Sequence, residues 1–352
     1  MKDQLVGIQV LRAFAALAVV AFHFTVSLQQ DFHLTAGLVF PAGANGVDVF
    51  FVISGFIMSY TTARPSERSP ASFVLKRLAR IVPLYWVMTL AVFGLGLAAP
   101  ALFHLSQASL TQLLRSLIFI PYARADGMAE PVLFLGWTLN YEMFFYAIFA
   151  AAMLISQRFY LWITIGAILA LTAIGQFVHS GILLAFYTND IMLEFVWGCL
   201  LFLIFQRWAK AVSALSLVWI LGVALLAAQN YIEPGWPRGL EKGLPALLIV
   251  GGVLGSTMQD GVLRRTFARI GDASYSLYLG HPYALGLTAK LAIGLLGASV
   301  LSATRAGVAG LAISLLGALA SFFLLERPSN NWLRRQLSGE KPPAGREPIL
   351  PA

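Results

Sequence analysis

The stretch Leu5–Phe24, LVGIQVLRAFAALAVVAFHF, decides the fold of this chain. Its twenty residues hold one formal charge, Arg12, and one further titratable group, His23, so the run is apolar and long enough to cross a bilayer as a helix. Because a helix turns ~100° and rises ~1.5 Å per residue, Arg12 and His23 lie within about 20° of one face and roughly 16 Å apart. The small residues between them predict that this stripe forms one wall of a narrow channel: Ala15, Ala16 and Val19.

The composition of the whole chain is that of a polytopic membrane protein. The 352 residues are 59% hydrophobic and 11% charged, with a mean hydropathy of +0.77. This excludes a globular enzyme and leaves no room for a soluble domain of useful size. The single cysteine, Cys199, excludes an internal disulfide and a cysteine-based metal site. The sequence also contains no Gly-rich nucleotide loop and no H-E-x-x-H metal pattern.

The apolar runs predict an all-α fold with about ten transmembrane helices. The runs are 5–28, 46–63, 79–98, 135–155, 159–178, 189–206, 212–229, 242–258, 276–297 and 303–325. Polar or Gly positions interrupt two of them, 159–178 and 212–229. With a cytoplasmic N-terminus, 17 of the 24 Lys and Arg residues fall in the termini and even-numbered loops, so the positive-inside rule predicts that both termini are cytoplasmic. The basic residues behind the net charge of +8 thus lie between apolar runs, in the pattern of a membrane topology, and no nucleic-acid partner is expected.

One acidic residue near the predicted outer surface has two interpretations. The run that begins GVDVFF returns inward and is predicted to place Asp48 at roughly the depth of His23. A carboxylate that reaches His23 would fix its tautomer and favour its protonated form. Alternatively, Asp48 only caps the second helix. Both interpretations stay open at this point.

A second polar group opens the run 135–155. Glu142 and Asn140 are predicted to lie one or two turns from the outer surface, beside Trp137 and Tyr141. Since aromatic faces stack on sugars and carboxylates accept hydrogen bonds from hydroxyls, this group predicts a sugar or proton site. The alternative is a polar contact between packed helices.

Basic and aromatic residues gather on the predicted cytoplasmic side. In SFVLKRLARIVPLYW, the cations Lys76, Arg77 and Arg80 precede Tyr85; they either meet anionic headgroups or bind the phosphates of a soluble cofactor. A second segment, RRTFARIGDASYSLYLGHPYAL, is interrupted by His281-Pro282. Its aromatic residues are predicted to lie in the inner half of the membrane, at the level of Arg12: Tyr275, Tyr278 and His281.

Six separated stretches resemble, in their order, those of the acyltransferase-3 family of integral membrane acyltransferases. They are LRAFAALAVVAFHF, GVDVFFVISGFIM, FVLKRLARIVPLYW, WTLNYEMFFY, SYSLYLGHP and LLERP. The resemblance covers nearly the whole chain and is closest to the exopolysaccharide O-acetyltransferases. It implies a transmembrane acyltransferase domain over residues 1–326 in a bacterial inner membrane. The polar, Pro-rich residues 327–352 are expected to form a cytoplasmic tail that is partly disordered.

The resemblance implies transfer of an acyl group, most often acetyl from acetyl-CoA, to a hydroxyl of an exopolysaccharide or another cell-surface glycan. The expected partners are acyl-CoA as donor, a carbohydrate or lipid-linked saccharide as acceptor, and the lipid bilayer, with no metal. Whether the chain forms a homo-oligomer or associates with polysaccharide-assembly proteins stays open.

The same resemblance suggests roles for the candidate residues. His23 acts as general base on the sugar hydroxyl or is transiently acylated, with Asp48 or Glu142 orienting it, and Arg12 binds the donor or neutralises charge near the thioester. The expected CoA-binding residues are Arg12, Lys76, Arg77, Arg80, Tyr85, Arg264, Arg265, Arg269, Tyr275, Tyr278 and His281. The expected acceptor-binding residues are Trp137, Asn140, Tyr141 and Glu142.

The competing hypothesis is a transporter or flippase for a lipid-linked saccharide. Ten spans and buried charges also describe transporters. Against it, the apolar runs contain no internal repeat and no pair of matching broken helices.

Overall fold

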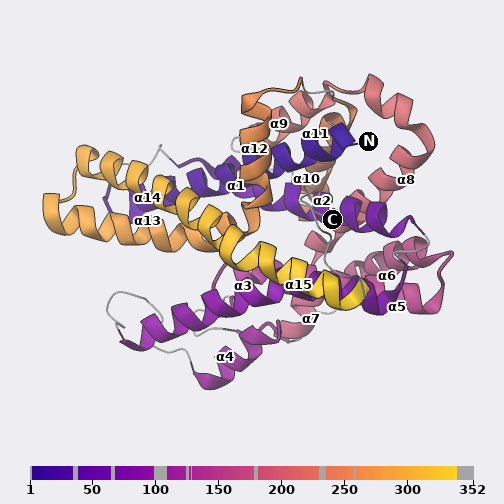
Figure 1. The fold of residues 1–352 in the computed structure, drawn as a ribbon, viewed down its shortest axis with the longest axis horizontal. Coiled ribbons are helices and arrows are strands. Elements are labelled where there is room, and N and C mark those ends of the chain that lie inside the picture. Colours follow the sequence, from indigo (N-terminus) through magenta and orange to yellow (C-terminus); the bar gives the residue numbers. More distant parts are fainter. Residues whose placement is uncertain are drawn as a thin grey trace. The chain divides into compact units, whose positions relative to one another are not determined.

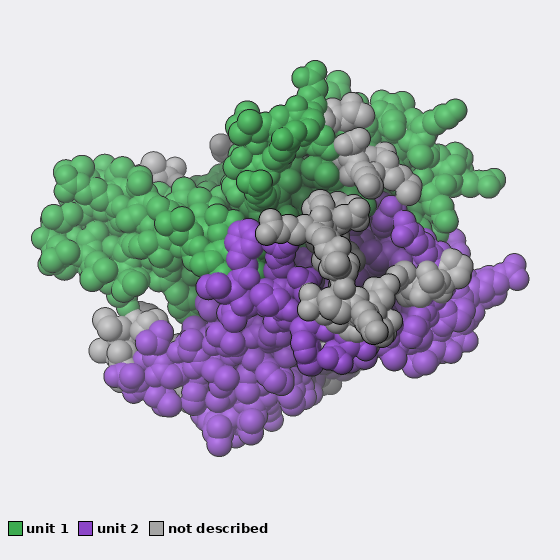
Figure 2. Space-filling model, in the orientation of Figure 1, with its two compact units in different colours: residues 1–53, 200–322 green, residues 54–199, 323–352 purple. Residues whose placement is uncertain are grey.

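The computed structural model describes residues 2–34, 39–64, 68–98, 109–123, 127, 129–177, 181–229, 235–256 and 259–338. Throughout these residues the regular elements are helices and no strand occurs, which confirms the all-α prediction for the described part of the chain (Figure 1). Two compact units are present, one made of residues 1–53 and 200–322 and the other of residues 54–199 and 323–352 (Figure 2).

The first unit is built around the long N-terminal helix. Its elements are α1 (Lys2–Gln30), η1 (Pro41–Asn45), the start of α2 (Gly46–Thr62), most of α8 (Leu193–Ala214), α9 (Val218–Ala228), α10 (Arg238–Glu241), α11 (Gly243–Gly255), α12 (Val262–Asp272), α13 (Ser274–Leu296) and α14 (Val300–Ser321). Helices α11, α12 and α13 and the short η1 all pack against α1. The run that the sequence singles out is thus the central helix of this unit.

The second unit contains the middle of the chain and its C-terminal helix. It holds the rest of α2, then α3 (Pro70–Ala98), α4 (Leu110–Leu117), α5 (Gly136–Ile155), α6 (Tyr160–Gly175), α7 (Ile182–Tyr187), η3 (Asp190–Met192), the first turns of α8, η4 (Phe322–Glu326) and α15 (Arg327–Ser338). Stacked rings hold its helices together: Phe73 of α3 stacks on Phe149 of α5 at 5.0 Å, and Phe145 of α5 stacks on Phe195 of α8 at 4.5 Å.

Six segments of the described chain are long and apolar enough to cross a membrane: Leu5–Gln30, Pro41–Thr62, Pro70–Ala98, Gly136–Ile155, Ile182–Lys210 and Val300–Trp332. Each of the ten predicted runs overlaps a helix, but four of these helices fall outside this set. Helices α6, α9 and α11 have only 16, 11 and 13 residues. Helix α13 has 23 residues, but its polar N-terminal half lowers its hydropathy. The structure therefore establishes a helical membrane protein, and the count of ten spans stays a prediction.

Glycines of neighbouring helices approach the backbone of α1 closely. Gly46, at the start of α2, lies against the Ala15 carbonyl and Val19, and Gly271 of α12 lies against the Gln9 carbonyl. Ala15, Ala16 and Val19 are consequently 6%, 0% and 1% exposed. This stripe is a packing surface, so the prediction of a channel wall is wrong for these three residues.

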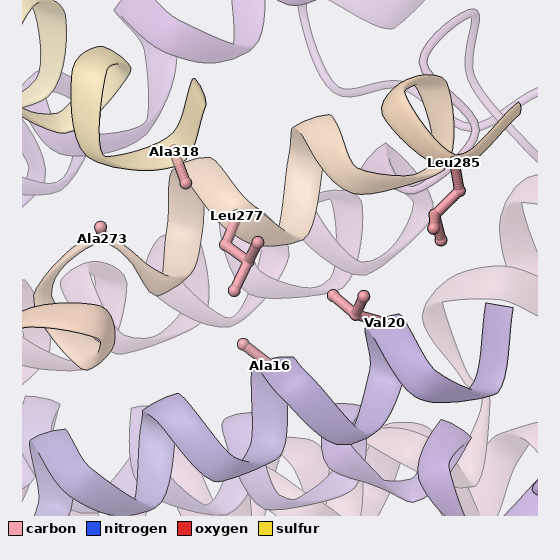
Figure 3. Close-up of a cluster of buried hydrophobic side chains, with 6 residues drawn as sticks. All are labelled: Ala16, Val20, Ala273, Leu277, Leu285 and Ala318. Atoms are coloured by element: carbon pink, nitrogen blue, oxygen red, sulfur yellow. The ribbon is translucent and has the colours of Figure 1, made fainter. Parts of the chain in front are cut away.

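Helices α1 and α13 run side by side in the same direction. Figure 3 shows Ala16 and Val20 of α1 facing Leu277 and Leu285 of α13, in a cluster completed by Ala273 and Ala318. Just beyond the end of α1, Phe32 packs with Ala289 of α13 and with Ala303 and Ala306 of α14. Since residue numbers rise together along the two helices, α13 runs parallel to the second half of α1.

The chain passes from α14 to α15 without a break in helical structure. A π-helical turn over Phe322–Glu326 contains the first three residues of the LLERP stretch, and the last two begin α15. Pro328 follows in the first turn of α15, where a missing N–H is tolerated. The polar tail, expected to be partly disordered, thus begins with a twelve-residue helix, and residues 339–352 lie outside the described residues.

The contact between Gly271 and the Gln9 carbonyl gives a stability prediction. A Cβ at position 271 would overlap backbone atoms of α1, which cannot move aside as a flexible side chain would. We expect Gly271→Ala to lower the stability of the detergent-solubilised protein by about 1–3 kcal/mol, the usual cost of overpacking, measured as a lower midpoint of thermal unfolding. The control is Gly286→Ala in α13, where a Cβ meets no atom within 4 Å. An unchanged midpoint for Gly271→Ala would contradict this account of the α1–α12 contact.

Candidate active site

Two imidazole rings meet inside the first unit. His281 Nε2 of α13 lies 3.1 Å from His23 Nδ1 of α1, and the ring centroids are 5.0 Å apart. His281 is fully buried and His23 is partly buried. An imidazole can exchange a proton near neutral pH, so this pair can take part in proton transfer.

The level at which His281 lies differs from the prediction. The sequence predicts His281 at the level of Arg12, because only a few apolar residues precede it in its run. In the structure α12 covers the first turns of α1, with Phe267 stacked on Phe14 at 4.7 Å and Gly271 against Gln9. Helix α13 therefore begins further along α1, and His281 contacts His23 instead of lying beside Arg12.

Backbone carbonyls of their own helices contact both rings. His23 Nδ1 lies 3.0 Å from the Val19 carbonyl oxygen, and His281 Nδ1 lies 3.1 Å from the Leu277 carbonyl oxygen. Aromatic rings surround the pair: Phe22 packs edge-on to His23, Tyr278 packs on His281, and Phe50 of α2 packs on Tyr278. The two histidines thus sit in a pocket of backbone acceptors and apolar rings.

Arg12 lies on the same helix as His23, toward its N-terminus. Its Nη1 donates a hydrogen bond to Gln9 Oε1 at 3.3 Å, and its side chain is partly buried. Since α1 is a continuous helix from Lys2 to Gln30, the predicted spacing of roughly 16 Å along the helix holds. A cation and an imidazole are therefore presented by one rigid element.

Asp48 pairs with Arg238, and not with His23. Asp48 Oδ1 accepts a hydrogen bond from Arg238 Nη2 at 2.8 Å; the Asp48 side chain is 0% exposed and that of Arg238 is 41% exposed. The predicted depth of Asp48 is also wrong. Helix η1 runs along α1, the Phe40 N–H donates to Thr25 Oγ1 at 3.0 Å, and Gly46 reaches Ala15 and Val19. Helix α2 therefore begins beside residues that precede His23 by one to two turns.

The three arginines of α12 differ in exposure. Arg265 and Arg269 are exposed and Arg264 is half-buried. Arg265 donates two hydrogen bonds to Asp260, from Nε at 3.1 Å and from Nη2 at 2.5 Å, and this contact lowers the pKa of the Asp260 carboxyl. Tyr275, one turn after Gly271, is half-buried. Of these cations, Arg265 already has a carboxylate partner.

In the second unit, Glu142 lies in a polar cluster. Its Oε1 accepts hydrogen bonds from Ser54 Oγ of α2 at 3.0 Å and from the Tyr146 hydroxyl one turn along α5. Arg77 of α3 is close enough to Tyr146 for an electrostatic interaction, and its guanidinium lies over the Phe73 ring at 5.8 Å. Arg77 is only 5% exposed. Arg77 is therefore less accessible than Lys76 and Arg80, and its part in CoA binding stays a prediction.

Among the other candidate residues of the second unit, some side chains are partly accessible and others are buried in helix packing. Lys76 and Arg80 are half-buried on α3. Tyr85, expected near a cofactor, is fully buried, stacks on Phe119 at 4.7 Å and donates to the Ser116 carbonyl at 3.1 Å. Its hydroxyl links α3 to the end of α4, and a contact of Tyr85 with a cofactor stays a prediction.

The predicted aromatic group on α5 is largely used in packing. The Tyr141 ring stacks on Phe186 at 3.9 Å, and Trp137 packs edge-on to Tyr141. Asn140 is buried, and its side-chain amide has no hydrogen-bond partner among the described residues. Trp137 and Glu142 remain partly accessible, so they are the members of this group that a ligand can reach.

Two residues that the sequence does not single out are prominent in the structure. Arg238 is one of them; a basic residue just before the run 242–258, together with Asp48 at the start of the run 46–63, would have been the signal. Glu194 is the other, and it is 0% exposed in α8. No sequence signal distinguishes it from Asp190, one turn earlier, which is half-buried.

The described residues contain no group of three or more His, Cys, Asp or Glu side chains that could hold a metal ion. Two large grooves, of about 860 and 620 Å³, are lined almost wholly by apolar side chains, and none of the predicted site residues lines them. Grooves of this kind suit lipid chains in a membrane protein, so the histidine pair remains the best candidate for chemistry.

Comparison with known proteins places these residues in a family context. A family model described as "Acyltransferase domain" matches residues 5–325. The exopolysaccharide production protein ExoZ of Rhizobium meliloti (strain 1021) is 40% identical over 309 residues, which cover 82% of this chain and 90% of that protein. BcsY of Komagataeibacter xylinus, provisionally named a membrane-bound transacylase, is 28% identical over 95% of this chain and 85% of its own. The acyltransferase MdmB of Streptomyces mycarofaciens is 27% identical over 93% and 92%. No solved structure matches the chain.

The Asp48–Arg238 pair gives a second stability prediction. Because Asp48 is fully buried, Arg238→Ala leaves its charge without a partner, and we expect a loss on the order of 2 kcal/mol, below the ~3–5 kcal/mol of wholly buried pairs since Arg238 is partly exposed. Thermal unfolding in detergent measures it. Arg265→Ala is the matched control, because it breaks an ion pair with Asp260 that is exposed on both sides, and its midpoint should hardly move. Equal midpoints for both variants would show that burial of Asp48 does not matter.

Proposed function

This chain belongs to the membrane acyltransferase family defined by that domain, and we propose that it transfers an acyl group, most often acetyl, from acyl-CoA to a carbohydrate hydroxyl. The proposed acceptor is an exopolysaccharide or another cell-surface glycan, in line with the name of the ExoZ relative. The matches give no support to the alternative of a transporter or flippase.

The contact between His23 and His281 carries the proposal. A hydroxyl becomes a good nucleophile only when a base takes its proton, and a histidine inside a helical membrane unit can do this near neutral pH. Burying two polar imidazoles among apolar rings costs free energy, and packing alone gives no reason for that cost. A role in the reaction does.

In the proposed reaction His23 accepts the proton of the sugar hydroxyl while the hydroxyl oxygen attacks the thioester carbonyl carbon. A C–O ester bond forms, the C–S bond breaks, and the proton passes from His23 to the leaving CoA thiolate. Transient acylation of His23 is the covalent variant of the same scheme. Arg12, on the same helix, binds the donor or neutralises the charge that develops at the thioester.

The remaining cations and polar residues complete the proposal. Arg264 and Arg269 on α12, and Lys76 and Arg80 on α3, are accessible enough to contact the phosphates of CoA. Trp137 and Glu142 are the proposed acceptor-binding residues, because they are the partly accessible members of the α5 group. We further propose ten spans with both termini in the cytoplasm of a bacterium, in its inner membrane, which the overlap of every apolar run with a helix supports.

Release of CoA from acetyl-CoA by the purified protein in detergent tests the proposal. With a mixture of carbohydrate acceptors, we expect acceptor-dependent release by the wild type and a loss of at least ~10²-fold in His23→Ala, since general-base catalysis typically contributes 10²–10⁴. Arg12→Ala should raise the KM for acetyl-CoA or abolish release.

The controls remove the same residue types outside the site. His33→Ala removes an exposed histidine, and Arg305→Ala removes an exposed arginine of α14; both should retain acceptor-dependent release. Full activity of a correctly inserted His23→Ala protein would disprove the role of His23. Absence of any acetyl-CoA binding by the wild type would favour transport.

A further inference from the structure

We propose that His281 is a positioning residue that fixes the proton of His23 on Nδ1, so that Nε2 of His23 is the atom that accepts the proton of the acceptor hydroxyl. This inference rests on the proposed function and deepens it. It follows from the hydrogen-bonding partners of the two rings, first those of His281 and then those of His23.

The tautomer of His281 follows from its surroundings. Its Nδ1 lies 3.1 Å from the Leu277 carbonyl oxygen, and the His281 ring also interacts with the backbone of Tyr278. A carbonyl oxygen can only accept a hydrogen bond, so Nδ1 must carry the proton. In a neutral ring the other nitrogen, Nε2, then has a lone pair and accepts.

Pro282 explains why His281 holds this tautomer firmly. In an α-helix the N–H of residue 282 would donate to the Tyr278 carbonyl, but proline has no N–H. The proline therefore leaves a carbonyl beside His281 without its usual donor. Helix α13 continues through Pro282 from Ser274 to Leu296, and the Tyr278 carbonyl is a second acceptor for the ring proton of His281.

The tautomer of His23 follows in turn. Its Nδ1 lies 3.1 Å from His281 Nε2 and 3.0 Å from the Val19 carbonyl oxygen, both of which are acceptors. Nδ1 of His23 must therefore carry the proton, and Nε2 has the lone pair. When Nε2 takes the proton of the hydroxyl, the ring becomes a cation whose Nδ1–H is still held by His281 and Val19.

This division of roles resembles the one in serine hydrolases, where a buried carboxylate holds the Nδ1–H of the catalytic histidine. The carboxylate that the sequence suggests for this role, Asp48, is paired with Arg238. A neutral imidazole acceptor has an advantage at a buried position, since a carboxylate there would need a second charge to balance it. His281 acts through His23 and need not touch the substrate.

Two substitutions at position 281 separate the acceptor from the ring. His281→Phe keeps an aromatic ring and removes both nitrogens, while His281→Gln keeps an acceptor oxygen that can reach the position of Nε2. We expect His281→Phe to lower kcat for acceptor-dependent CoA release by at least ~10-fold with little change in the KM for acetyl-CoA, because loss of the correct tautomer costs up to ~10⁴ in the serine hydrolases. We expect His281→Gln to stay within a few fold of the wild type.

Nitrogen NMR of the ¹⁵N-histidine-labelled protein gives a readout that a purely structural role would not move. The chain has five histidines, so the signals of His23 can be identified from a His23→Ala sample. The wild type should show His23 with its proton on Nδ1, and His281→Phe should shift it toward Nε2. Wild-type His23 with its proton on Nε2 would overturn the inference, even if the variants fail to fold.

The outcomes separate the two proposals. If His23→Ala is inactive while His281→Phe keeps both its kcat and the Nδ1 proton of His23, the positioning role of His281 is wrong and the proposed function stands. If His23→Ala is fully active, the role of His23 in the proposed function fails, and the inference fails with it.

Discussion

The packing of α13 along α1 is the constraint on which the candidate site depends. Small side chains, Ala16, Ala273 and Ala318, allow the helices to come close, and Leu277 and Leu285 fill the space between them (Figure 3). The same parallel arrangement sets the level of every later residue of α13 against α1. His281 reaches His23 only because α12 first covers the start of α1, which moves the beginning of α13 along the central helix. A shift of α13 by one turn would separate the two imidazoles.

Several buried polar groups of the two units have specific partners that offset the cost of leaving water. Asp48 is paired with Arg238, Glu142 accepts from the hydroxyls of Ser54 and Tyr146, and both histidines contact backbone carbonyls. The contacts of Asp48 and Glu142 link helices within the units in which they occur. The histidine pair differs, because its hydrogen bonds run in sequence from the Leu277 carbonyl to His23. Whether one nitrogen donates or accepts determines whether the next one donates or accepts. Such a chain can hold one proton in place and leave a defined nitrogen to accept another.

The chain belongs to the acyltransferase family, and in the structure His23 of the first helix has His281 as a partner. The proposed reaction with a thioester needs a base, a cation near the donor and a site that excludes water. In this proposal His23 and Arg12 of α1 supply the base and the cation from a single rigid helix. Such a small set of polar residues is consistent with a membrane protein of which only 11% of the residues are charged.

The sequence by itself determined the helices, the membrane class and the two residues of α1, since these depend on local properties. Hydropathy located every apolar run, and a helical repeat of 3.6 residues put Arg12 and His23 on one face. Tertiary structure alone decided the partners. Asp48 meets Arg238 from a distant part of the chain, Arg77 is buried beside Tyr146, and His281 meets His23 instead of lying at the level of Arg12. Pairings of this kind depend on where one helix starts relative to another, and that offset is set by packing between distant segments, which no local pattern in the sequence records.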